Sequence, residues 1–448
     1  MNKKIVVVGA GVTGVNAITK LVDNGYPGEL ITVIDKGKDP YNRLPSEIMK
    51  GFLGSGGWSD GKLTYHTSIG GQLSKYCGEE KAYELMGEVI NNFRRFHPKP
   101  EEIKCSDPQE EPDFIKPYFN LKLFPVYHIG TDYLSEIAKN WYDYLISKNV
   151  HFEFEAEVID INFDTRMLTV VLPISDRYFH LDYDKLIFAV GKAGIGFTQK
   201  IIDKYKLPTE SKPSQIGVRF EAPQHHFQKL IDLSYDFKLY RKDDKVSIRS
   251  FCVNNNAAYV AVEESYKDIT YNGHAKKDSK YENGMTNFGI IMEIQGIEDP
   301  FDWCRDIVRK CQGKVWINKL EDKFIKTGLF YSPNGTRTTS KDSEGKQIRA
   351  YEACGDVLDT FKENFGEYSK YVLDFIEDLK KIFPTLGDDW GIYIPEVKYL
   401  NDEVLVNHEN LSLLDYPDVY FGGDTLSSRS IVIAGSQGVL IALNLLKN

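Results

Sequence analysis

The chain has 448 residues, of which 42% are hydrophobic and 13% aromatic, so it is long enough for two or three domains and too apolar to be disordered as a whole. Its 65 acidic and 55 basic side chains give a formal net charge of -10, which disfavours nucleic acid or an anionic membrane as the main partner. No run approaches the ~20 apolar residues of a membrane span. The six cysteines are scattered, which suits a reducing cytoplasm, and they form neither a CxxC pair nor a zinc-spaced cluster, so we expect no metal site.

The first 35 residues form the most informative stretch of the chain. Residues 5–8 (IVVV) predict a strand that is buried on both faces. The glycine turn GAGVTG follows at residues 9–14, residues 15–22 predict a helix, and residues 30–34 predict a second strand. An acid, Asp35, ends this second strand. Strand, glycine turn, helix, strand and acid together are the context in which a GxGxxG motif indicates a nucleotide site.

Each residue of this motif has a physical reason to be there. Gly9 permits the tight turn off the strand, Gly11 has no Cβ and lets a pyrophosphate approach the backbone, and Gly14 lets the helix pack closely on the strand. The free N–H groups and positive end of the helix face the anion. Asp35 is placed to accept hydrogen bonds from both hydroxyls of a ribose. The motif therefore predicts a bound dinucleotide.

A glycine-rich loop follows the second strand. Five of the eleven residues 51–61 are glycine, which disfavours a helix or a strand there. Trp58 and Leu63 are large apolar residues in or beside the loop, so we expect it to be packed and its backbone to contact a flat or anionic ligand. Residues 80–96 then predict an amphipathic helix, and residues 123–132 a short strand before a helix over 133–147 that is capped near Thr131.

The remaining elements fall into three groups. Residues 150–171 predict a strand pair, and residues 183–191 predict a buried strand that ends in glycine. Within residues 199–394, segments in which apolar and polar residues alternate predict a mixed or antiparallel sheet. Its strands are expected at 215–221, 246–253, 258–262 and 288–294, and helices at 300–311 and 369–382. The C-terminus has a short strand at 419–421, a Gly-Gly-Asp-Thr turn and a helix of small and apolar residues at 430–446, which is typical of the closing unit of a cofactor fold.

Four segments resemble a family of FAD-dependent dehydrogenases that is related to the glutathione-reductase-type flavoproteins. They are the glycine turn at 9–14 with Asp35; the loop GSGGWSDGKL at 54–63, which looks like the "FSDGKL" loop of that group; residues 124–132 together with KPSQIGVRFEAP at 212–223; and residues 422–438. The first motif is shared by many nucleotide folds, whereas the second and third are specific to this group. Together the segments span nearly the whole chain.

The resemblance implies an α/β fold, in which a Rossmann-like FAD-binding domain of the glutathione-reductase type carries an inserted α+β substrate domain. The FAD-binding domain would comprise residues 1–196 and 396–448, and the substrate domain residues 197–395. The implied cofactor is FAD, with the glycine turn at the pyrophosphate and Asp35 at the adenosine ribose. The cofactor-binding residues implied in this way are Gly9, Ala10, Gly11, Val12, Thr13, Gly14, Asp35, Lys36, Gly37, Arg43, Gly56, Gly57, Trp58, Ser59, Val158, Ala189, Val190, Gly191, Gly423, Asp424, Ser430 and Ile431.

The resemblance also assigns particular roles to some of these residues. Arg43 would lie near the ribose and phosphates, and Val158 would contact the adenine through its backbone. Asp424 would bind the ribityl chain or the pyrophosphate. The last helix would point its N-terminus at the flavin N1–C2=O group, where its N–H donors and positive potential would stabilise an anionic reduced flavin. The chain departs from the group at two places. Val190 stands where Thr or Ser is usual, and the C-terminal loop has fewer glycines than in many relatives. The residues around the flavin, and hence the reaction, are therefore not defined by the resemblance.

The reaction is less well defined than the cofactor. The chain has no CxxxxC pair and no second complete Rossmann unit after Gly191, so we expect neither disulfide reduction nor a permanent NAD(P) domain. Hydride would come from a small organic substrate bound between the domains, or from NAD(P)H that visits the flavin transiently. The catalytic candidates are Lys62, Asp60 and Arg429, with His66 and Arg219 as further polar residues to consider.

The sequence raises two further possibilities, a metal site and a different function. His225 and His226 form a histidine pair, but adjacent side chains point apart, so we expect no metal there. The alternative to an oxidoreductase is a flavin-dependent RNA-modifying enzyme or a non-catalytic flavin-fold binding protein. The net charge of -10 and the lack of a Lys/Arg stripe count against RNA as the substrate.

Overall fold

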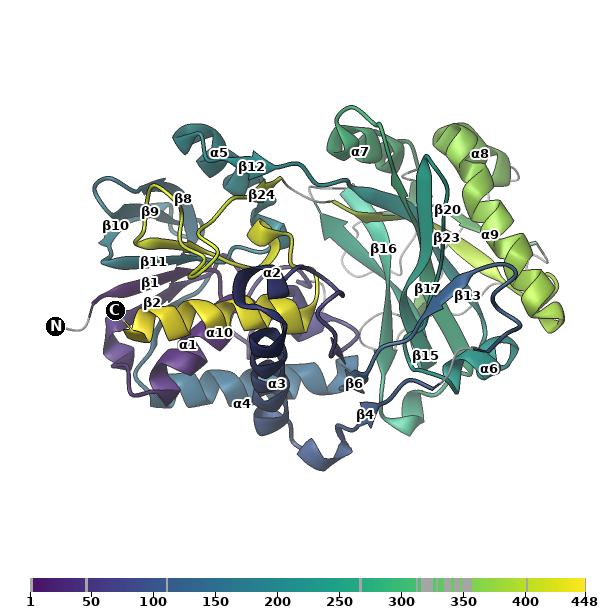
Figure 1. The fold of residues 1–448 in the computed structure, drawn as a ribbon. Coiled ribbons are helices and arrows are strands. Elements are labelled where there is room, and N and C mark those ends of the chain that lie inside the picture. The colour runs from purple at the N-terminus through teal and green to yellow at the C-terminus, as the bar shows by residue number, and fades with distance from the viewer. Residues whose placement is uncertain are drawn as a thin grey trace.

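The computed structural model describes residues 3–44, 47–109, 112–265, 268–311, 313–315, 325–327, 329–333, 340–341, 347–348, 357–399 and 402–447. Over this part, the chain forms two units that lie side by side, as Figure 1 shows. Each unit has its own main sheet and its own hydrophobic core.

The first unit is built on a five-stranded parallel sheet with the strand order β25-β11-β1-β2-β7. Its strands are β1 (Ile5–Val8), β2 (Ile31–Ile34), β7 (His151–Glu153), β11 (Lys185–Phe188) and β25 (Val419–Phe421). Val8 lies opposite both Ile34 and Phe188, so the central strands end level with one another. The chain runs from β1 to β2 and β7 on one side and returns to β11 and β25 on the other, so the strand order reverses between β1 and β11. The α/β fold and the first strand–helix–strand unit predicted from the sequence are confirmed.

Helices cover one face of this sheet, and a small antiparallel sheet lies on the other (Figure 1). The helices are α1 (Val12–Asp23), α3 (Glu79–Phe96), α4 (Thr131–Ser147) and α10 (Ile431–Lys447). The small sheet consists of β8 (Glu157–Asn162), β9 (Met167–Leu172) and β10 (Arg177–Asp182). The small residues of α10 allow it to contact α1 closely, since a Cβ at Gly438 would lie 2.0 Å from the Thr13 carbonyl oxygen.

Three local predictions for this unit were wrong in part. The predicted strand pair at 150–171 is split at Glu155, whose φ of 52° turns the chain from the parallel sheet into the small sheet. Helix α4 begins at Thr131 with Gly130 as its N-cap, while the Thr131 hydroxyl donates to the Ser59 and Ala275 carbonyls instead of capping. The glycine-rich loop contains a 3-10 turn, η2 (Gly54–Trp58), and is followed by a short strand, β3 (Lys62–Thr64).

The second unit is an eight-stranded sheet in which neighbouring strands are antiparallel. Its strands are β5 (Asn120–Lys122), β13 (Gln215–Pro223), β14 (Lys238–Lys242), β15 (Val246–Ser265), β16 (Asp268–Lys276), β17 (Met285–Ile294), β20 (Leu329–Tyr331) and β23 (Gly391–Lys398). The mixed or antiparallel sheet predicted here is confirmed, although β15 is one strand where two were predicted. β5 lies before residue 197, so the second sheet also draws on an earlier part of the chain; the domain boundaries stay a prediction.

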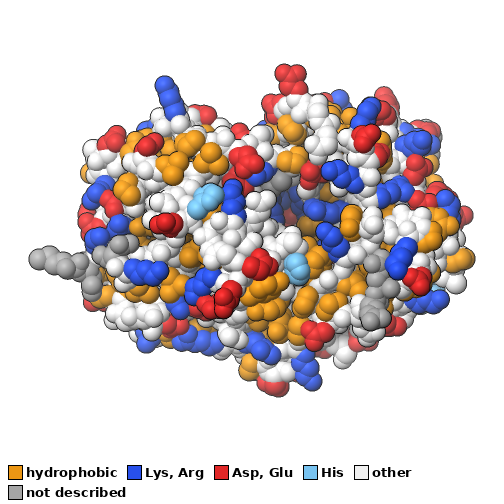
Figure 2. Space-filling model, viewed as in Figure 1, with side chains coloured by type: hydrophobic (Ala, Val, Ile, Leu, Met, Phe, Trp, Pro, Cys, Tyr) orange, Lys and Arg blue, Asp and Glu red, His pale blue; other side chains and the backbone are white. Residues whose placement is uncertain are grey.

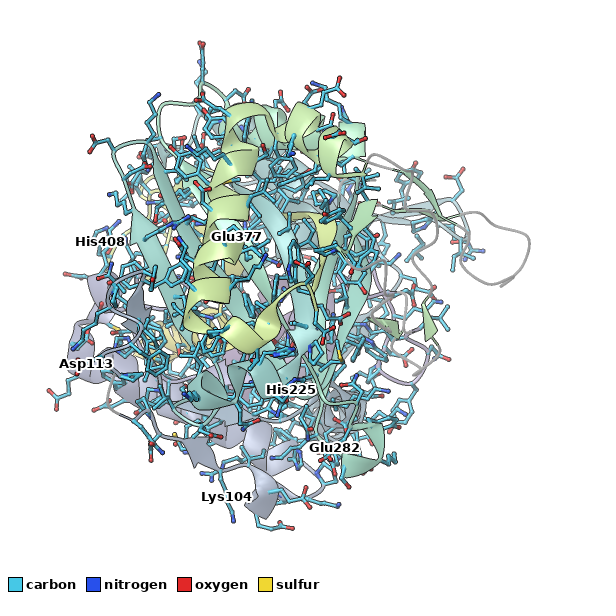
Figure 3. The ribbon with its side chains drawn as sticks, turned by 90° about the vertical axis from the view of Figure 1, so that its right-hand side faces the viewer. Lys104, Asp113, His225, Glu282, Glu377 and His408 are labelled. Atoms are coloured by element: carbon cyan, nitrogen blue, oxygen red, sulfur yellow. The ribbon has the colours of Figure 1, made fainter. Side chains whose placement is uncertain are left out.

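One face of the second sheet is apolar and is covered by helices. These are α7 (Pro300–Cys311), α8 (Val357–Phe365) and α9 (Ser369–Ile382), and their buried side chains form one core with alternate residues of the strands. Figure 3 shows α8 and α9 lying across this face, with the exposed Glu377 of α9 in front. On β13, Val218 and Phe220 belong to this core. Because successive side chains of a strand point to opposite faces, Arg219 and Glu221 lie on the other face of the sheet, where they are also buried.

The opposite face of the second sheet is polar and meets the first unit. Arg219 and Glu396 are fully buried there and form an ion pair of 2.8 Å. The Lys62 ammonium donates to the Val253 carbonyl at 2.6 Å, and the Cys252 thiol lies 2.8 Å from the Asp60 carboxylate, so side chains of the two units interlock. We call this contact region the seam.

The described residues offer neither a membrane-spanning helix nor a metal-binding group. No helix there has both the length and the apolar character that a membrane crossing requires. The described His, Cys, Asp and Glu side chains include no group of three that could hold a metal ion. His226 instead lies within hydrogen-bond distance of the Thr385 hydroxyl and the Asp389 carboxylate.

Candidate functional site

A cavity opens at the carboxyl ends of β1, β2 and β11, where the strand order reverses. In open α/β sheets this is where ligands bind. Most of the residues predicted to bind a cofactor meet there although they come from distant parts of the chain. The predicted residues that line the cavity are Gly9, Gly11, Val12, Thr13, Asp35, Lys36, Gly56, Val158, Ala189, Val190, Gly191, Gly423, Asp424, Arg429, Ser430 and Ile431.

The glycine turn forms one wall of this cavity. Gly9 has a φ of +104°, and a Cβ there would lie 2.2 Å from the Ala189 carbonyl oxygen. A Cβ at Gly14 would lie 2.3 Å from the Gly9 carbonyl oxygen, so α1 packs against the turn only because this position is glycine. Gly11 differs from both, because its nearest neighbour would be the Ala189 oxygen at 3.9 Å. The bare backbone of Gly11 is therefore exposed to open space inside the cavity.

Two helices begin at the wall of the cavity. Gly11 is the N-cap of α1, and the first bond of that helix runs from the Val15 N–H to the Gly11 carbonyl. The N–H of Ala434 bonds to the Ser430 carbonyl in the same way at the start of α10. The N–H groups of the first turn have no partner within a helix, and both helix ends carry positive potential. The cavity is thus suited to a ligand with at least one anionic group.

The Asp35 carboxylate is bound more fully than the sequence suggested. Its Oδ1 accepts from the N–H groups of Gly37 (2.7 Å) and Gly51 (2.9 Å), and its Oδ2 accepts from the N–H of Ala10 (2.9 Å). A carboxylate oxygen has two acceptor positions, so one position on Oδ2 is left for a ligand. Asp35 therefore joins the glycine turn to the following loop as well as lining the cavity.

Arg43 holds the loop after β2 together. Its guanidinium donates to the carbonyl groups of Glu47, Ile48, Phe52 and Gly54 at 2.7–3.0 Å. It also lies 5.5 Å from the centre of the Trp58 ring. Burial lowers the pKa of Arg43 to about 10, although the charges of Asp35 and Glu47 oppose this shift. Arg43 was predicted to lie near the ribose and phosphates. It does not line the cavity, and its hydrogen bonds instead stabilise the conformation of the loop.

The C-terminal loop supplies a charged pair and a free hydroxyl. Asp424 and Arg429 form an ion pair of 3.1 Å, and the Arg429 guanidinium also donates to the Tyr399 carbonyl. Ser428 lines the cavity and is 2% exposed, yet its hydroxyl has no hydrogen-bond partner among the described residues. A buried hydroxyl without a partner is costly, so Ser428 is suited to hydrogen-bond a ligand.

The predicted catalytic residues Lys62 and Asp60 lie at the seam and do not line the cavity. The Lys62 ammonium is 3.1 Å from Asp60 and 3.7 Å from Asp236. Burial alone would raise the pKa of Asp60, but the charge of Lys62 and the Cys252 contact outweigh it and lower the pKa to about 2. Burial would lower the pKa of Lys62, but Asp236 and Asp60 raise it well above its ordinary value. This lysine remains charged and paired, so its catalytic role stays a prediction without support from the geometry.

The other predicted residues also have defined places. Arg219 is bound by Glu396 and Asn272 in the second sheet, and the ring of His66 packs on Phe124. The predicted cofactor residues that do not line the cavity are Ala10, Gly14, Gly37, Arg43, Gly57, Trp58 and Ser59.

Sequence reasoning missed several lining residues. They are Val8, Ile34, Met49, Lys50, Leu53, Gly54, Ser55, Ala156, Glu157, Lys192, Ala193, Gly194, Phe197, Ser428 and Ala434. Lys192 directly follows the predicted strand end at Gly191, and Ser428 lies in the loop between the predicted Asp424 and Ser430. Extending each predicted segment by a few residues would have included both.

Comparison with known proteins gave no family. No family model matches the chain, and no curated protein matches it. Among solved structures, 2,6-dihydroxypyridine-3-hydroxylase from Arthrobacter nicotinovorans is similar with a TM-score of 0.47 and 12% identity, over 100% of this chain and 85% of that one. A flavoprotein/dehydrogenase from Cytophaga hutchinsonii is similar with a TM-score of 0.43 and 11% identity, over 99% of this chain and 79% of that one.

A third similar structure is glycerol-3-phosphate dehydrogenase from Bacillus halodurans in complex with FAD. Its TM-score is 0.40 and its identity 10%, over 100% of this chain and 64% of that one. At TM-scores this low, none of the three assigns a function to the chain.

Proposed function

We propose that this protein is an FAD-dependent oxidoreductase that acts on a small organic substrate. The observation that carries the proposal is the convergence of two helix N-termini, of α1 and α10, on one cavity at the reversal point of a parallel sheet. A dinucleotide needs positive potential at its phosphates, and a flavin needs it again at its pyrimidine end. The two helices meet both needs.

The residues present fit FAD at the phosphate end. The open space beside Gly11 admits a pyrophosphate to the backbone, and the first-turn N–H groups of α1 face it. Asp35 retains one acceptor position for a ribose hydroxyl. The Ser428 hydroxyl and the first turn of α10 would bind the flavin half.

The chemistry would take place between the two units. The chemistry that FAD would supply when bound is the acceptance of a hydride released by a carbon atom of the substrate. The chain's own part is to bind and orient: α10 would stabilise negative charge on the flavin, and the Asp424–Arg429 pair keeps the adjoining loop in place. The described second unit is an antiparallel sheet and not a parallel dinucleotide fold, so a nicotinamide, if used, would visit transiently.

Anaerobic reduction of the loaded protein tests this proposal. The purified protein is incubated with FAD, freed of excess cofactor and mixed with NADH, NADPH or members of a panel of small metabolites while the flavin absorbance is followed. Bleaching by at least one reductant, with colour restored by oxygen or another acceptor, is expected. Flavin that stays bound but is bleached only by dithionite would contradict an oxidoreductase and favour a binding protein.

A further inference from the structure

Lys192 is a cation of the cavity wall that the sequence analysis did not include. It follows the end of β11 and begins a short 3-10 turn at the cavity. Its ammonium group makes no hydrogen bond or ion pair with the residues that the structure describes. A partly buried charge without a hydrogen-bond partner is unfavourable, so this amine is suited to bind an anionic ligand.

The other lysines of the wall do have partners. The Lys36 ammonium donates to the Ala193 carbonyl at 2.7 Å. Lys50 is more exposed and lies 3.8 Å from the Glu47 carboxylate. Arg429, the remaining cation of the wall, is paired with Asp424. Lys192 also lines the cavity, and it differs from these neighbours in having no hydrogen bond or ion pair with the described residues.

Lys192 lies at the seam, where groups from the second unit influence it. Glu263 of β15 and Lys398 of β23 are close enough to act on its charge, as are Arg429 and Asp424 of the first unit. Burial, reinforced by the two other cations, lowers the pKa of Lys192 to about 8, although Glu263 and Asp424 oppose this shift. The amine is still mostly protonated at neutral pH.

The neighbouring carboxylates are already bound elsewhere. Glu263 accepts a hydrogen bond from the Asn272 side chain at 2.7 Å. Lys398 is 3.2 Å from Glu396, which also binds Arg219. The largest electrostatic influences on Lys192 come from two cations, Lys398 and Arg429, and two anions, Glu263 and Asp424. Figure 2 shows Lys and Arg side chains gathered in the hollow between the two halves of the molecule.

We propose that Lys192 binds a carboxylate of the substrate, so that the substrate is a small organic acid held at the seam beside the flavin. This inference rests on the proposed function. The nearby carboxylates of Glu263 and Asp424 would repel a phosphate dianion about twice as strongly as the monoanion of a carboxylic acid, so a carboxylate fits beside Lys192 better. The phosphates of FAD have their own site at Gly11 and α1, whereas Lys192 is influenced from β15 and β23 of the second unit.

The test uses the FAD-loaded protein and three probe acids: acetate, propionate and benzoate. Each acid and its neutral amide is titrated into the protein while the visible flavin spectrum is recorded, because a ligand beside the flavin perturbs its bands. Lys192→Met removes the charge at similar length, and Lys192→Arg restores it. Lys212→Met is the matched control, because Lys212 pairs with Glu210 and Glu403 and does not line the cavity.

At least one acid should perturb the spectrum with a Kd roughly tenfold lower than that of its amide, as expected for one hydrogen bond to a charged group. Lys192→Met should abolish this preference while its affinity for FAD stays within about threefold of the wild-type value. Lys192→Arg should recover part of the preference, and Lys212→Met should retain all of it.

Three results would overturn the inference. Loss of FAD in Lys192→Met would make Lys192 a ligand of the cofactor phosphates. Equal affinity for acids and amides, or no perturbation by any acid, would exclude a carboxylate site. In these cases the flavin remains on the wild-type protein and the proposed function stands, whereas a wild-type protein that never binds FAD overturns both.

Discussion

Replacing Gly11 with valine separates cofactor binding from folding. The backbone at Gly11 has a φ of -71°, which valine adopts without strain, and the nearest atom to an added Cβ is 3.9 Å away. The cost to stability is that of an apolar residue at a helix N-cap, about 1 kcal/mol. The added carbons would occupy the space through which a pyrophosphate approaches the N–H groups of α1. Each lost hydrogen bond to a charged group costs about 1.5–3 kcal/mol, so FAD affinity should fall by about tenfold to a hundredfold.

Quenching of FAD fluorescence measures the affinity, and urea unfolding measures the stability. Gly87→Val is the matched control, because Gly87 lies on α3 outside the cavity and an added Cβ there would meet only the Tyr65 hydroxyl, at 4.0 Å. Gly14→Val should instead unfold the protein, since its Cβ would lie 2.3 Å from the Gly9 oxygen. A folded Gly11→Val protein that binds FAD within about threefold of wild type would refute the placement of the pyrophosphate.

Three further predictions concern the cavity and the seam. Ser428→Ala should weaken FAD binding by about twofold to tenfold in a fluorescence titration, whereas Ser427→Ala, beside the cavity but not lining it, should not. Arg219→Met leaves the buried Glu396 carboxylate with Lys398 as its remaining cation, and it should lower the free energy of unfolding in urea by about 3 kcal/mol; a loss below about 1 kcal/mol would contradict a buried pair. Burial lowers the pKa of His128 to about 3, below the ~6.5 of an unfolded histidine. The unfolded state therefore binds this proton more readily, and stability should fall as the pH decreases from about 6.5 towards 3. A His128→Gln protein with the same slope would exclude this group as a cause.

Local sequence patterns were sufficient for the first strand–helix–strand segment of the first unit. The run at 5–8, the glycine turn and the acid at 35 lie close together in the sequence, and the structure has strand, turn, helix and second strand in the predicted order, although β1 also pairs with the distant β11. The wrong prediction of two strands within β15 has a backbone cause. Cys252 and Asn256 have φ values of 52° and 66° inside β15, and the pairing with β17 shifts there, so one long strand looks like two in the sequence.

The site was harder to predict, because its side chains are arranged by contacts between distant segments. Lys62 looked catalytic from its place in a glycine-rich loop, but Asp236 and the Val253 carbonyl of the second unit bind it. Arg43 was predicted to lie near the ribose and phosphates, but its guanidinium donates to four carbonyls of one loop. Lys192 carries no motif, and only the fold shows that it faces the cavity without a partner.

The cavity between the first turns of α1 and α10 is proposed to hold FAD. The most direct measurement is the absorption spectrum of the purified protein after incubation with FAD and removal of the excess. The bands of oxidised flavin should remain with the protein at about one FAD per chain and shift from those of free FAD, because the site replaces water by helix ends and apolar walls. A colourless protein that neither retains FAD nor quenches its fluorescence would contradict the account.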